Sequence, residues 1–285
     1  MQGNKKKPLS LISVVIPCHN DPNVANAVKS AVNQTYVNKE IIVVNDGSDD
    51  KDTLKAISSV RDKIDILIDQ ENKGQSVARN NGIKRSSGSY ILNLDSDDYF
   101  ENSFCEKAVM VFERDQDVKI VTCKVNRTYH GQDIGIFEPA GGDIKNFLFA
   151  NAAVGSSMFR KKDWETTGGY EENLPILGFE DWEFYIQLLK NGGHAYVIPE
   201  LLFHYQIREN STTQRIRHLR QEKFKYIILK HKDLYQKNFE ELVGNLFERI
   251  EKESGDKKKI ENEITYRLGK ALLKPFQTFR SIIRK

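Results

Sequence analysis

One stretch decides how this chain folds: Ser89-Tyr90-Ile91-Leu92-Asn93-Leu94-Asp95-Ser96-Asp97-Asp98-Tyr99. It starts as a short apolar run of the length of a buried strand and ends in three carboxylates. Strand side chains alternate between two faces, so extended backbone beyond Leu94 would point Asp95 and Asp97 the same way. Such a carboxylate pair suits Mg²⁺ or Mn²⁺, but an ordinary Asp/Ser turn accounts for the same residues, and both interpretations stay open.

The first hundred residues alternate between strand-like and helix-like patterns. Strands are expected at 11–16, 40–44, 64–68 and 90–94, and helices at 24–32, 54–60 and 74–83. The nearly continuous apolar run of the second strand is typical of a parallel strand that is buried on both faces. This alternation predicts βαβ units and a doubly wound, mainly parallel sheet flanked by helices.

Polar clusters directly follow three of the predicted strands, at Pro17–Asp21, Asn45–Asp50 and Asp95–Asp98. Parallel strands bring their carboxyl ends to one edge of the sheet, and ligands of open α/β sheets bind at that edge. A single polar strand end is ordinary. Three acidic or amide-rich strand ends together predict a ligand site.

The second half of the chain is less regular. A helix is expected at 103–112, strands at 119–124, 154–159 and 195–198, and a loop at 131–142. Asp181 lies near the start of a further predicted helix, where the helix dipole favours a carboxylate. Glu180 and Asp181 therefore also fit a purely structural role as helix caps.

Beyond Thr212 glycine is sparse and charge is dense, which predicts a helical C-terminal region at 212–285. Its last part, 266–285, repeats apolar residues at steps of three or four with basic residues on the other faces. This pattern fits an interfacial helix on an anionic membrane surface. A helix that packs on the protein body with a solvated basic back fits it as well.

Composition excludes several classes. The 285 residues are 39% hydrophobic and 29% charged, and the net charge of +3 indicates no nucleic-acid partner. The three cysteines, Cys18, Cys105 and Cys123, are widely spaced, which suits a reducing compartment and predicts neither a disulfide framework nor a zinc site. No signal peptide and no membrane-spanning segment are expected from the apolar runs.

Six segments, taken together and in order, resemble the family 2 glycosyltransferases, which are inverting enzymes with the Rossmann-like GT-A fold. They are Val14–Asn20, Gln34–Tyr36, Glu40–Ser48, Asn72–Asn80, Leu94–Asp98 and Gly178–Asp181. The resemblance covers about the first two hundred residues. It implies a catalytic domain at 1–211, with a nucleotide-sugar-binding half at 1–100 and an acceptor-binding half at 101–211.

The resemblance implies a donor site for a UDP-sugar. Asp46 would hydrogen-bond the uracil, and Asn45 before it departs mildly from the acidic pair often found in the family. Asp95 would reach the ribose or a metal-bound water. The other donor-binding residues implied are Pro17, His19, Asn20, Asn72, Gly74 and Arg79.

The resemblance also implies separate metal and base positions. Asp97 would ligate Mn²⁺ or Mg²⁺ on the diphosphate, with Asp95 and His204 as further candidate ligands. Asp181 would be the catalytic base. This division suits the chemistry, because the leaving oxygen gains negative charge while the attacking hydroxyl loses a proton on the opposite face.

Four further assignments are looser. His204 and Arg208 would lie near the metal or the diphosphate, although a histidine beside Tyr205 is also a common packed residue. Trp182, next to the base, would stack on an acceptor sugar or only anchor its helix. Glu180 is a candidate acceptor contact.

The expected function is metal-dependent, inverting transfer of a hexose or N-acetylhexosamine from a UDP-sugar to a saccharide or lipid-linked glycan. The family setting is a bacterial cytoplasmic enzyme at the inner face of the membrane that builds a surface polysaccharide. An inactive nucleotide-sugar-binding partner subunit is one alternative. A Mg²⁺-dependent phosphotransferase is a weaker one, since no GxxxxGK[ST] or GxGxxG motif is present.

Overall fold

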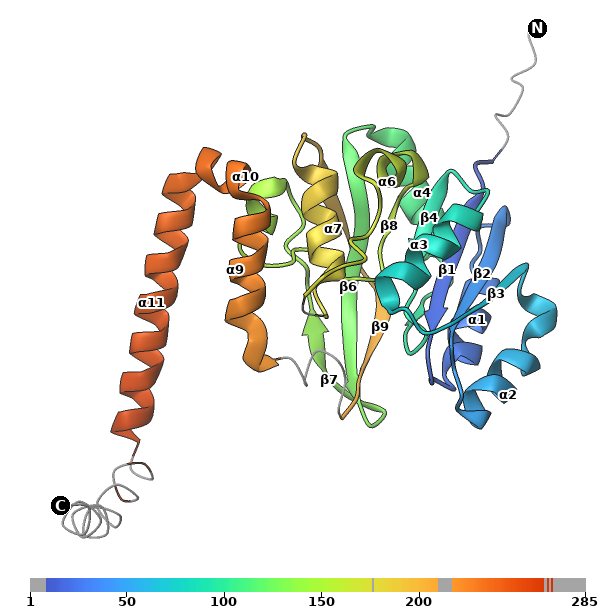
Figure 1. Cartoon of the computed structure of the whole chain (residues 1–285), viewed down its shortest axis with the longest axis horizontal. Coiled ribbons are helices and arrows are strands. Elements are labelled where there is room, and N and C mark those ends of the chain that lie inside the picture. The colour runs from blue at the N-terminus through green and yellow to red at the C-terminus, as the bar shows by residue number, and fades with distance from the viewer. Residues whose placement is uncertain (1–8, 176, 210–216, 264–265, 267, 269–285) are drawn as a thin grey trace, which may run out of the picture. The chain divides into compact units, whose positions relative to one another are not determined.

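The computed structural model describes residues 9–175, 177–209, 217–263, 266 and 268 (Figure 1). The chain divides into two compact units, Met1–Lys230 and His231–Lys285. The first unit contains the sheet and extends beyond residue 211, because helix α9 (Arg220–Lys230) belongs to it.

The first half of the sheet is wholly parallel, as the sequence predicts. Strands β1 (Ile12–Cys18), β2 (Lys39–Asp46), β3 (Ile66–Gln70) and β4 (Tyr90–Asn93) lie in the order β3-β2-β1-β4. All three neighbouring pairs run in the same direction. Their carboxyl ends therefore share one edge, which brings the polar clusters after β1, β2 and β4 together.

The second half of the sheet is mixed. β8 (Met158–Arg160) is antiparallel to β4, and it is followed in the sheet by β6 (Val118–Tyr129), β9 (His194–Ile207) and β5 (Tyr99–Phe100). β6 is antiparallel to β8 and parallel to β9. The long strands β6 and β9 consequently run in the direction of β4 and end on the same edge as the polar clusters.

Helices cover both faces of the sheet. Helices α1 (Val24–Val32) and α4 (Phe104–Arg114) share a core with Ile12, Val14 and Ile16 of β1. Helix α3 (Gln75–Arg85) packs on the opposite face, where Gly82 meets Val15 and Val44, and α7 (Glu180–Leu189) continues that layer (Figure 1). The other helices of this unit within the described residues are α2 (Lys51–Ser59), α5 (Ile144–Phe147), α6 (Lys161–Thr167), and two short 3₁₀ helices at Arg61–Lys63 and Arg217–Leu219.

Two sequence predictions in the second half were wrong. The expected loop at 131–142 contains strand β7 (Gln132–Phe137), which pairs with β6 through a tight hairpin turn at His130 and Gly131. The strand expected to end before Pro199 instead continues to Ile207. The β6–β9 register shifts near Lys124, so the proline, which has no N–H to donate, falls at an irregularity in the ladder.

The backbone of the opening stretch also differs from the prediction. Strand β4 ends at Asn93, and the N–H of Asp98 donates to the carbonyl of Asp95 at 3.1 Å, which closes a turn. Strand alternation therefore does not orient Asp95 and Asp97. Both nevertheless remain partly exposed at the edge of the sheet.

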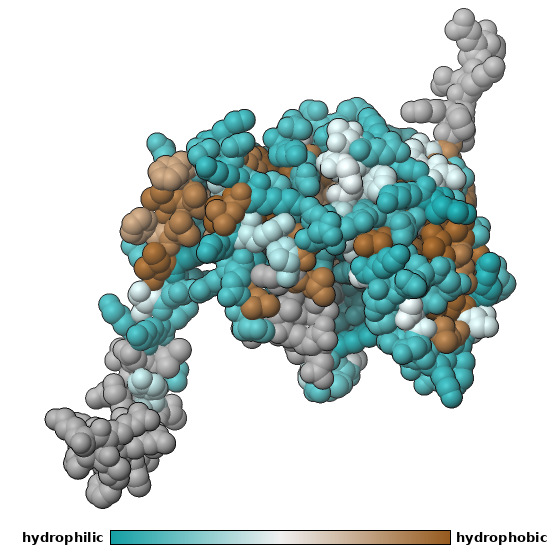
Figure 2. All heavy atoms as spheres, viewed as in Figure 1, coloured by the Kyte–Doolittle hydropathy of each residue, from teal (hydrophilic) through white to brown (hydrophobic). Residues whose placement is uncertain are grey.

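The second unit contains α10 (Lys232–Lys237) and α11 (Phe239–Asn262). Apolar side chains gather on α11, where Phe239, Phe247 and Ile250 are exposed (Figure 2). Within the described ranges, no helix combines the length and apolarity that crossing a bilayer requires. The basic amphipathic end predicted for 266–285 lies outside the described residues except at Tyr266 and Leu268.

Close packing of α3 on the sheet predicts that Gly82→Ala destabilises the first unit. A β-carbon at Gly82 would lie 2.5 Å from Cγ1 of the buried Val15. Overpacking of this kind costs about 1–3 kcal/mol. Scanning calorimetry should show a lower melting temperature for the sheet-containing unit.

Gly244→Ala is the matched control, because a β-carbon there meets no atom within 4 Å on α11. It should not lower the melting temperature of any transition, since alanine favours a helix over glycine by about 1 kcal/mol. Equal melting temperatures for Gly82→Ala and the unchanged protein would contradict direct packing of α3 on β1.

Candidate active site

Loops that follow β1, β2 and β3 meet at the carboxyl edge of the sheet. Gly47 has a φ of 70°, and a β-carbon there would lie 2.5 Å from the backbone nitrogen of Asn72. Only glycine permits this approach without strain. The loop after β2 therefore rests directly on the loop that leads into α3.

Asp46 holds the segment that starts α3. Its carboxylate is buried and accepts hydrogen bonds from the backbone N–H groups of Lys73 and Gly74, each at 2.9 Å, and from the amide of Gln70 at 2.8 Å. Gly74 has a φ of 89° and caps the helix. A single carboxylate thus fixes the backbone of the expected nucleobase pocket.

His19 and Asn72, which the resemblance implies as donor-binding residues, contact each other. Nδ1 of His19 lies 2.9 Å from the carbonyl oxygen of Asp46, and Nε2 lies 3.0 Å from the amide nitrogen of Asn72. A carbonyl only accepts, so the neutral ring carries its proton on Nδ1 and accepts from Asn72 on Nε2. The exposed imidazole is therefore held in one orientation beside the loop.

Asn20 and Pro17 have different positions. Asn20 adopts a left-handed backbone with a φ of 49° and binds the loop after β2, where its amide oxygen accepts from the N–H groups of Asp49 and Asp50. Pro17 is buried within β1. Asn20 thus joins two loops of the site, whereas Pro17 belongs to the strand.

The carboxylate of Asp95 is held by a buried cation, Arg79. Nη2 of Arg79 donates to Oδ1 of Asp95 at 2.6 Å, and the amide of Gln75 donates to the same oxygen at 3.0 Å. Arg79 is only 2% exposed and its guanidinium lies over the ring of Tyr170, 5.3 Å from the centroid. In this structure Arg79 supports Asp95 and does not line the open surface.

Asp97 belongs to an ionic cluster with Arg208, which the resemblance placed near the metal or the diphosphate, and with Asp21, which the sequence did not predict. Nη2 of Arg208 lies 3.4 Å from Oδ2 of Asp97. The same atom donates to the two carboxylate oxygens of Asp21 at 3.0 and 2.9 Å. Asp21 is buried and also accepts from the hydroxyl of Ser96 at 2.8 Å. Arg208 therefore connects the ends of β1, β4 and β9.

The residues present are compatible with a divalent cation at Asp97. Burial, followed by the charge of Asp95, raises the pKa of Asp97 to about 6, so additional positive charge would favour its ionised form. Mg²⁺ takes as few as one or two protein carboxylates when water and phosphate complete its shell. In the described part of the chain no group of three or more His, Cys, Asp or Glu residues is arranged around one metal position.

His204 and Asp98 have partners of their own. Nε2 of His204 lies 2.7 Å from Oε1 of Glu101, and its ring stacks on Tyr99 with centroids 4.3 Å apart. Asp98 is buried and accepts from the N–H of Gln206 at 2.9 Å. The contacts of His204 thus run to Glu101 and Tyr99, and those of Asp98 hold the β5–β9 junction.

Asp181 lies in the first turn of α7. Burial, opposed by the nearby charge of Arg79 and reinforced by Glu180, raises the pKa of Asp181 to about 6. Its Oδ2 accepts a hydrogen bond at 2.8 Å from the amide of Asn151, which sequence reasoning missed because an isolated asparagine in a loop carries no signal. The carboxylate is therefore mostly ionised, and so able to accept a proton, above about pH 6.

The residues beside Asp181 have structural partners. Both carboxylate oxygens of Glu180 lie 2.9 Å from the backbone nitrogen of Gly178, so Glu180 holds the turn that leads into α7. The indole N–H of Trp182 donates to the carbonyl of Phe147 at 2.6 Å, and its ring stacks on Phe224 of α9. These contacts match the anchoring interpretation of Trp182.

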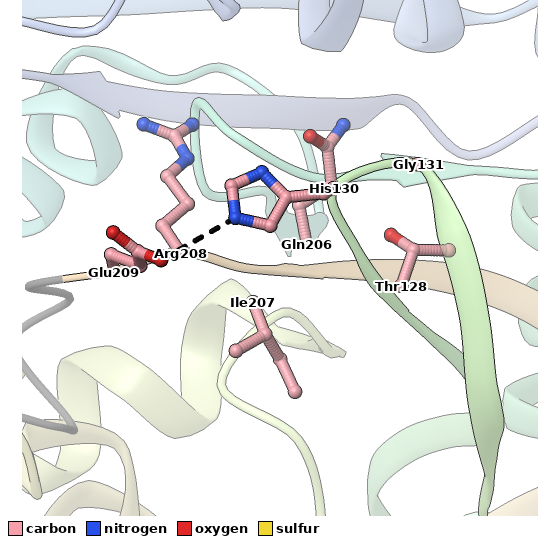
Figure 3. Close-up of a pocket in the computed structure, with 7 residues that line it drawn as sticks. All are labelled: Thr128, His130, Gly131, Gln206, Ile207, Arg208 and Glu209. Carbon is pink, nitrogen blue, oxygen red and sulfur yellow. Dashed lines mark ion pairs between the residues drawn. The ribbon is translucent and has the colours of Figure 1, made fainter.

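An open cavity of about 260 Å³ lies beside Arg208 (Figure 3). The turn between β6 and β7 and the end of β9 line it, and His130 pairs with Glu209 at 3.5 Å across it. Figure 3 shows the His130 ring next to Arg208, with Ile207 pointing away from both. The cavity thus adjoins the cluster that contains Asp97.

A family model settles the relationship that this geometry suggests. The model described as glycosyl transferase family 2 matches residues 13–166, more than half of the chain. This chain belongs to glycosyltransferase family 2. A second model, described as the N-terminal domain of galactosyltransferase, matches residues 146–231 and so includes the segment that carries Asn151 and Asp181.

Relatives in this family come from several bacteria. Glycosyltransferase GlyA of Streptococcus pneumoniae is 39% identical over 71% of this chain, but the match spans only 31% of GlyA. The TuaG protein of Bacillus subtilis, named as a putative teichuronic acid biosynthesis glycosyltransferase, is 28% identical over 70% of this chain and 81% of its own length. Chondroitin synthase of Escherichia coli is 30% identical over 67% of this chain and 28% of the synthase.

Solved structures confirm the GT-A fold. Staphylococcus aureus TarS 1–349 in complex with UDP-GlcNAc aligns over 71% of this chain and 60% of that chain, with a TM-score of 0.59 and 18% identity. The complex of the same protein with UDP aligns with a TM-score of 0.57 and 19% identity. The predicted α/β sheet with flanking helices is confirmed, and so is the predicted family.

The role of Asp46 predicts that Asp46→Asn loosens the loop before α3. An asparagine side chain offers one acceptor oxygen in place of two, so one of the backbone N–H groups of Lys73 and Gly74 loses its partner. Hydrogen–deuterium exchange of residues 72–74 should become faster. Asp62→Asn, at an exposed side chain, is the control. Unchanged protection in Asp46→Asn would show that Asp46 does not hold this loop.

Proposed function

We propose that this family 2 chain is an inverting glycosyltransferase that moves a hexose or N-acetylhexosamine from a UDP-sugar to a saccharide or lipid-linked glycan. One observation carries the proposal: two carboxylates with different partners lie near the buried Arg79. Asp95 accepts a hydrogen bond from Arg79, whereas Asp181 interacts with Arg79 through charge and accepts its own hydrogen bond from Asn151. Inverting transfer needs two such separated positions, one for the leaving group and one for the attacking hydroxyl.

The donor nucleotide fits the loops around Asp46. The backbone fixed by Asp46, the oriented ring of His19 and the amide of Asn72 place polar groups together at the carboxyl edge of the parallel strands. Amides, carboxylates and backbone groups are what recognition of a uracil and a ribose requires. The TarS structures with UDP and UDP-GlcNAc have the same fold, which supports a UDP-sugar as donor.

The leaving diphosphate fits the cluster of Asp97 and Arg208. A guanidinium binds phosphate oxygens with paired donors, and Arg208 is one-third exposed, so its donors remain reachable. Asp97, with Asp95 as the second candidate ligand, would hold Mn²⁺ or Mg²⁺. A bound divalent cation supplies Lewis-acid stabilisation of the charge that develops on the leaving oxygen.

Asp181 fits the general base. Its carboxylate takes the proton of the acceptor hydroxyl while the hydroxyl oxygen bonds to the anomeric carbon and the sugar–phosphate bond breaks toward UDP. One displacement of this kind inverts the anomeric configuration. Burial raises the pKa of Asp181 to about 6, which brings its proton affinity closer to neutral pH than that of an ordinary aspartate.

The acceptor proposal is a bacterial surface polysaccharide or its lipid-linked precursor, made at the cytoplasmic face of the membrane. The names of TuaG and chondroitin synthase, both matched over at least two thirds of this chain, support a polysaccharide product. The basic pattern of 266–285 supports contact with an anionic lipid surface.

A catalytically inactive partner subunit is the second candidate. Such a protein would lack one of the site carboxylates, yet Asp46, Asp95, Asp97 and Asp181 are all present in this chain. A phosphotransferase with an Asp-x-Asp nucleophile is disfavoured further, since that pair follows the fourth strand here and β1 ends with Pro17 and Cys18.

Replacement of the base should separate chemistry from binding. We expect Asp181→Asn to lower transfer by about 10²–10⁴-fold, the usual contribution of a general base. UDP affinity should stay unchanged, because the side-chain hydrogen bond of Asp181 runs to Asn151 and not to the nucleotide loops. The measurement is UDP release over a panel of UDP-sugars and glycan acceptors, with Asp52→Asn on an exposed part of α2 as control. Full activity in Asp181→Asn would remove Asp181 as the base.

Removal of the metal position should act on binding. In isothermal titration of UDP, Mn²⁺ should strengthen binding to the unchanged protein, and Asp97→Ala should abolish that gain. Binding of UDP without metal should change little, since Asp46 and its loop remain. Asp62→Ala, at an exposed carboxylate, should behave like the unchanged protein. An undiminished Mn²⁺ effect in Asp97→Ala would exclude Asp97 as a ligand.

A further inference from the structure

We propose that Asn151 is a positioning residue for Asp181: it holds Oδ2 of that carboxylate and thereby directs Oδ1 toward the acceptor hydroxyl. The inference rests on the proposed role of Asp181 as base. Nδ2 of Asn151 lies 2.8 Å from Oδ2, and this is the one side-chain hydrogen bond to Asp181 found within the described residues.

The orientation of the Asn151 amide is set by its second hydrogen bond. Its oxygen accepts from the backbone N–H of Ala153 at 3.2 Å. A backbone N–H can only donate, so the amide cannot be flipped without placing two donors against each other. The NH₂ group must therefore face Asp181, where it favours the ionised carboxylate.

The loop that carries Asn151 is seated on the same helix as Asp181. The hydroxyl of Tyr185 lies 2.8 Å from the carbonyl of Val154 and 3.0 Å from that of Gly155. Tyr185 is buried and follows Asp181 by four residues, so both side chains lie on one face of α7. The loop is thus fixed to α7 at two points, one of which is the carboxylate itself.

Gly155 closes the remaining space around Oδ2. A β-carbon at this position would lie 3.0 Å from Oδ2 of Asp181, which is closer than side chains ordinarily approach. The loop backbone and the Asn151 amide therefore occupy the Oδ2 side. Oδ1 is left as the oxygen that can reach a hydroxyl of the acceptor and take its proton.

The expected consequence is a lower pKa for Asp181 than burial alone would set. The charge of Arg79 and the hydrogen bonds donated by Asn151 and by the backbone N–H of Trp182 stabilise the charged form of the carboxylate. Burial and the charges of Glu180 and Asp95 favour the neutral form. Loss of the Asn151 donor should therefore raise the pKa of Asp181. The proton-accepting form would then appear only at higher pH.

The decisive measurement is the titration of Asp181 by NMR of protein labelled with ¹³C at the aspartate carboxyl carbons, assigned with Asp181→Asn. In Asn151→Ala the midpoint should rise by about one pH unit. Asn151→Asp keeps the acceptor for Ala153 but removes the donor and adds a like charge, so its midpoint should rise further. Asn126→Ala is the matched control, because Asn126 donates to Asp133 at the same 2.8 Å on the β6–β7 hairpin.

An unchanged midpoint in both Asn151 variants, with melting temperatures showing a folded protein, would overturn the proposal. The kinetic readout is the acidic limb of kcat/KM against pH, which should move upward by the same amount in Asn151→Ala while KM for the donor stays constant. A limb that stays in place would also overturn it. Failure of the base assignment is distinguishable, since Asp181→Asn would then remain active whatever the Asn151 titrations show.

Discussion

The site depends on one buried cation. Arg79 lies 2% exposed between the sheet and the second half of the unit, with its guanidinium against Asp95 and over the ring of Tyr170. Burial of a charge is unfavourable unless it is compensated, and removal of one partner from a buried ion pair commonly costs about 3–5 kcal/mol. Arg79 comes from α3, Asp95 from the end of β4 and Tyr170 from the segment after α6, so this cation ties both halves of the catalytic unit together.

The same principle organises the outer part of the site. Arg208, at the end of β9, compensates Asp21 and Asp97 from two other strand ends. Carboxylates that converge at one sheet edge repel one another. Arg79 compensates Asp95 inside the protein, and Arg208 compensates Asp21 and Asp97 nearer the surface. The inner arginine is sealed from solvent, whereas the outer one remains one-third exposed and lies beside an open cavity. The buried Arg79 thus supports the site from inside the protein, whereas Arg208 presents a charge that a ligand can reach.

Sequence reasoning succeeded where local patterns carry physical constraint. The apolar runs of the parallel strands, the alternation with amphipathic helices and the ordered motifs predicted the GT-A fold and its family. It failed where a strand depends on pairing with its neighbour. All residues of β7 are exposed, and the strand forms by pairing with β6. β9 passes Pro199 because the proline falls at a shift in its register with β6.

The amino-acid sequence by itself determined which chemical groups stand at the ends of the strands, and hence that carboxylates and amides meet at one edge. Parallel strands leave no other place for them. Only the tertiary structure decided which of them act on each other. Asp21 contacts Arg208, which lies 187 positions away in the sequence, and Asn151 contacts Asp181, which lies 30 positions away. The turn at Asp95–Asp98 replaces the strand geometry that the pattern suggested. A hydrogen bond or ion pair weakens when the distance between its two atoms changes by a few tenths of an ångström. Only the packing of the whole unit sets those distances.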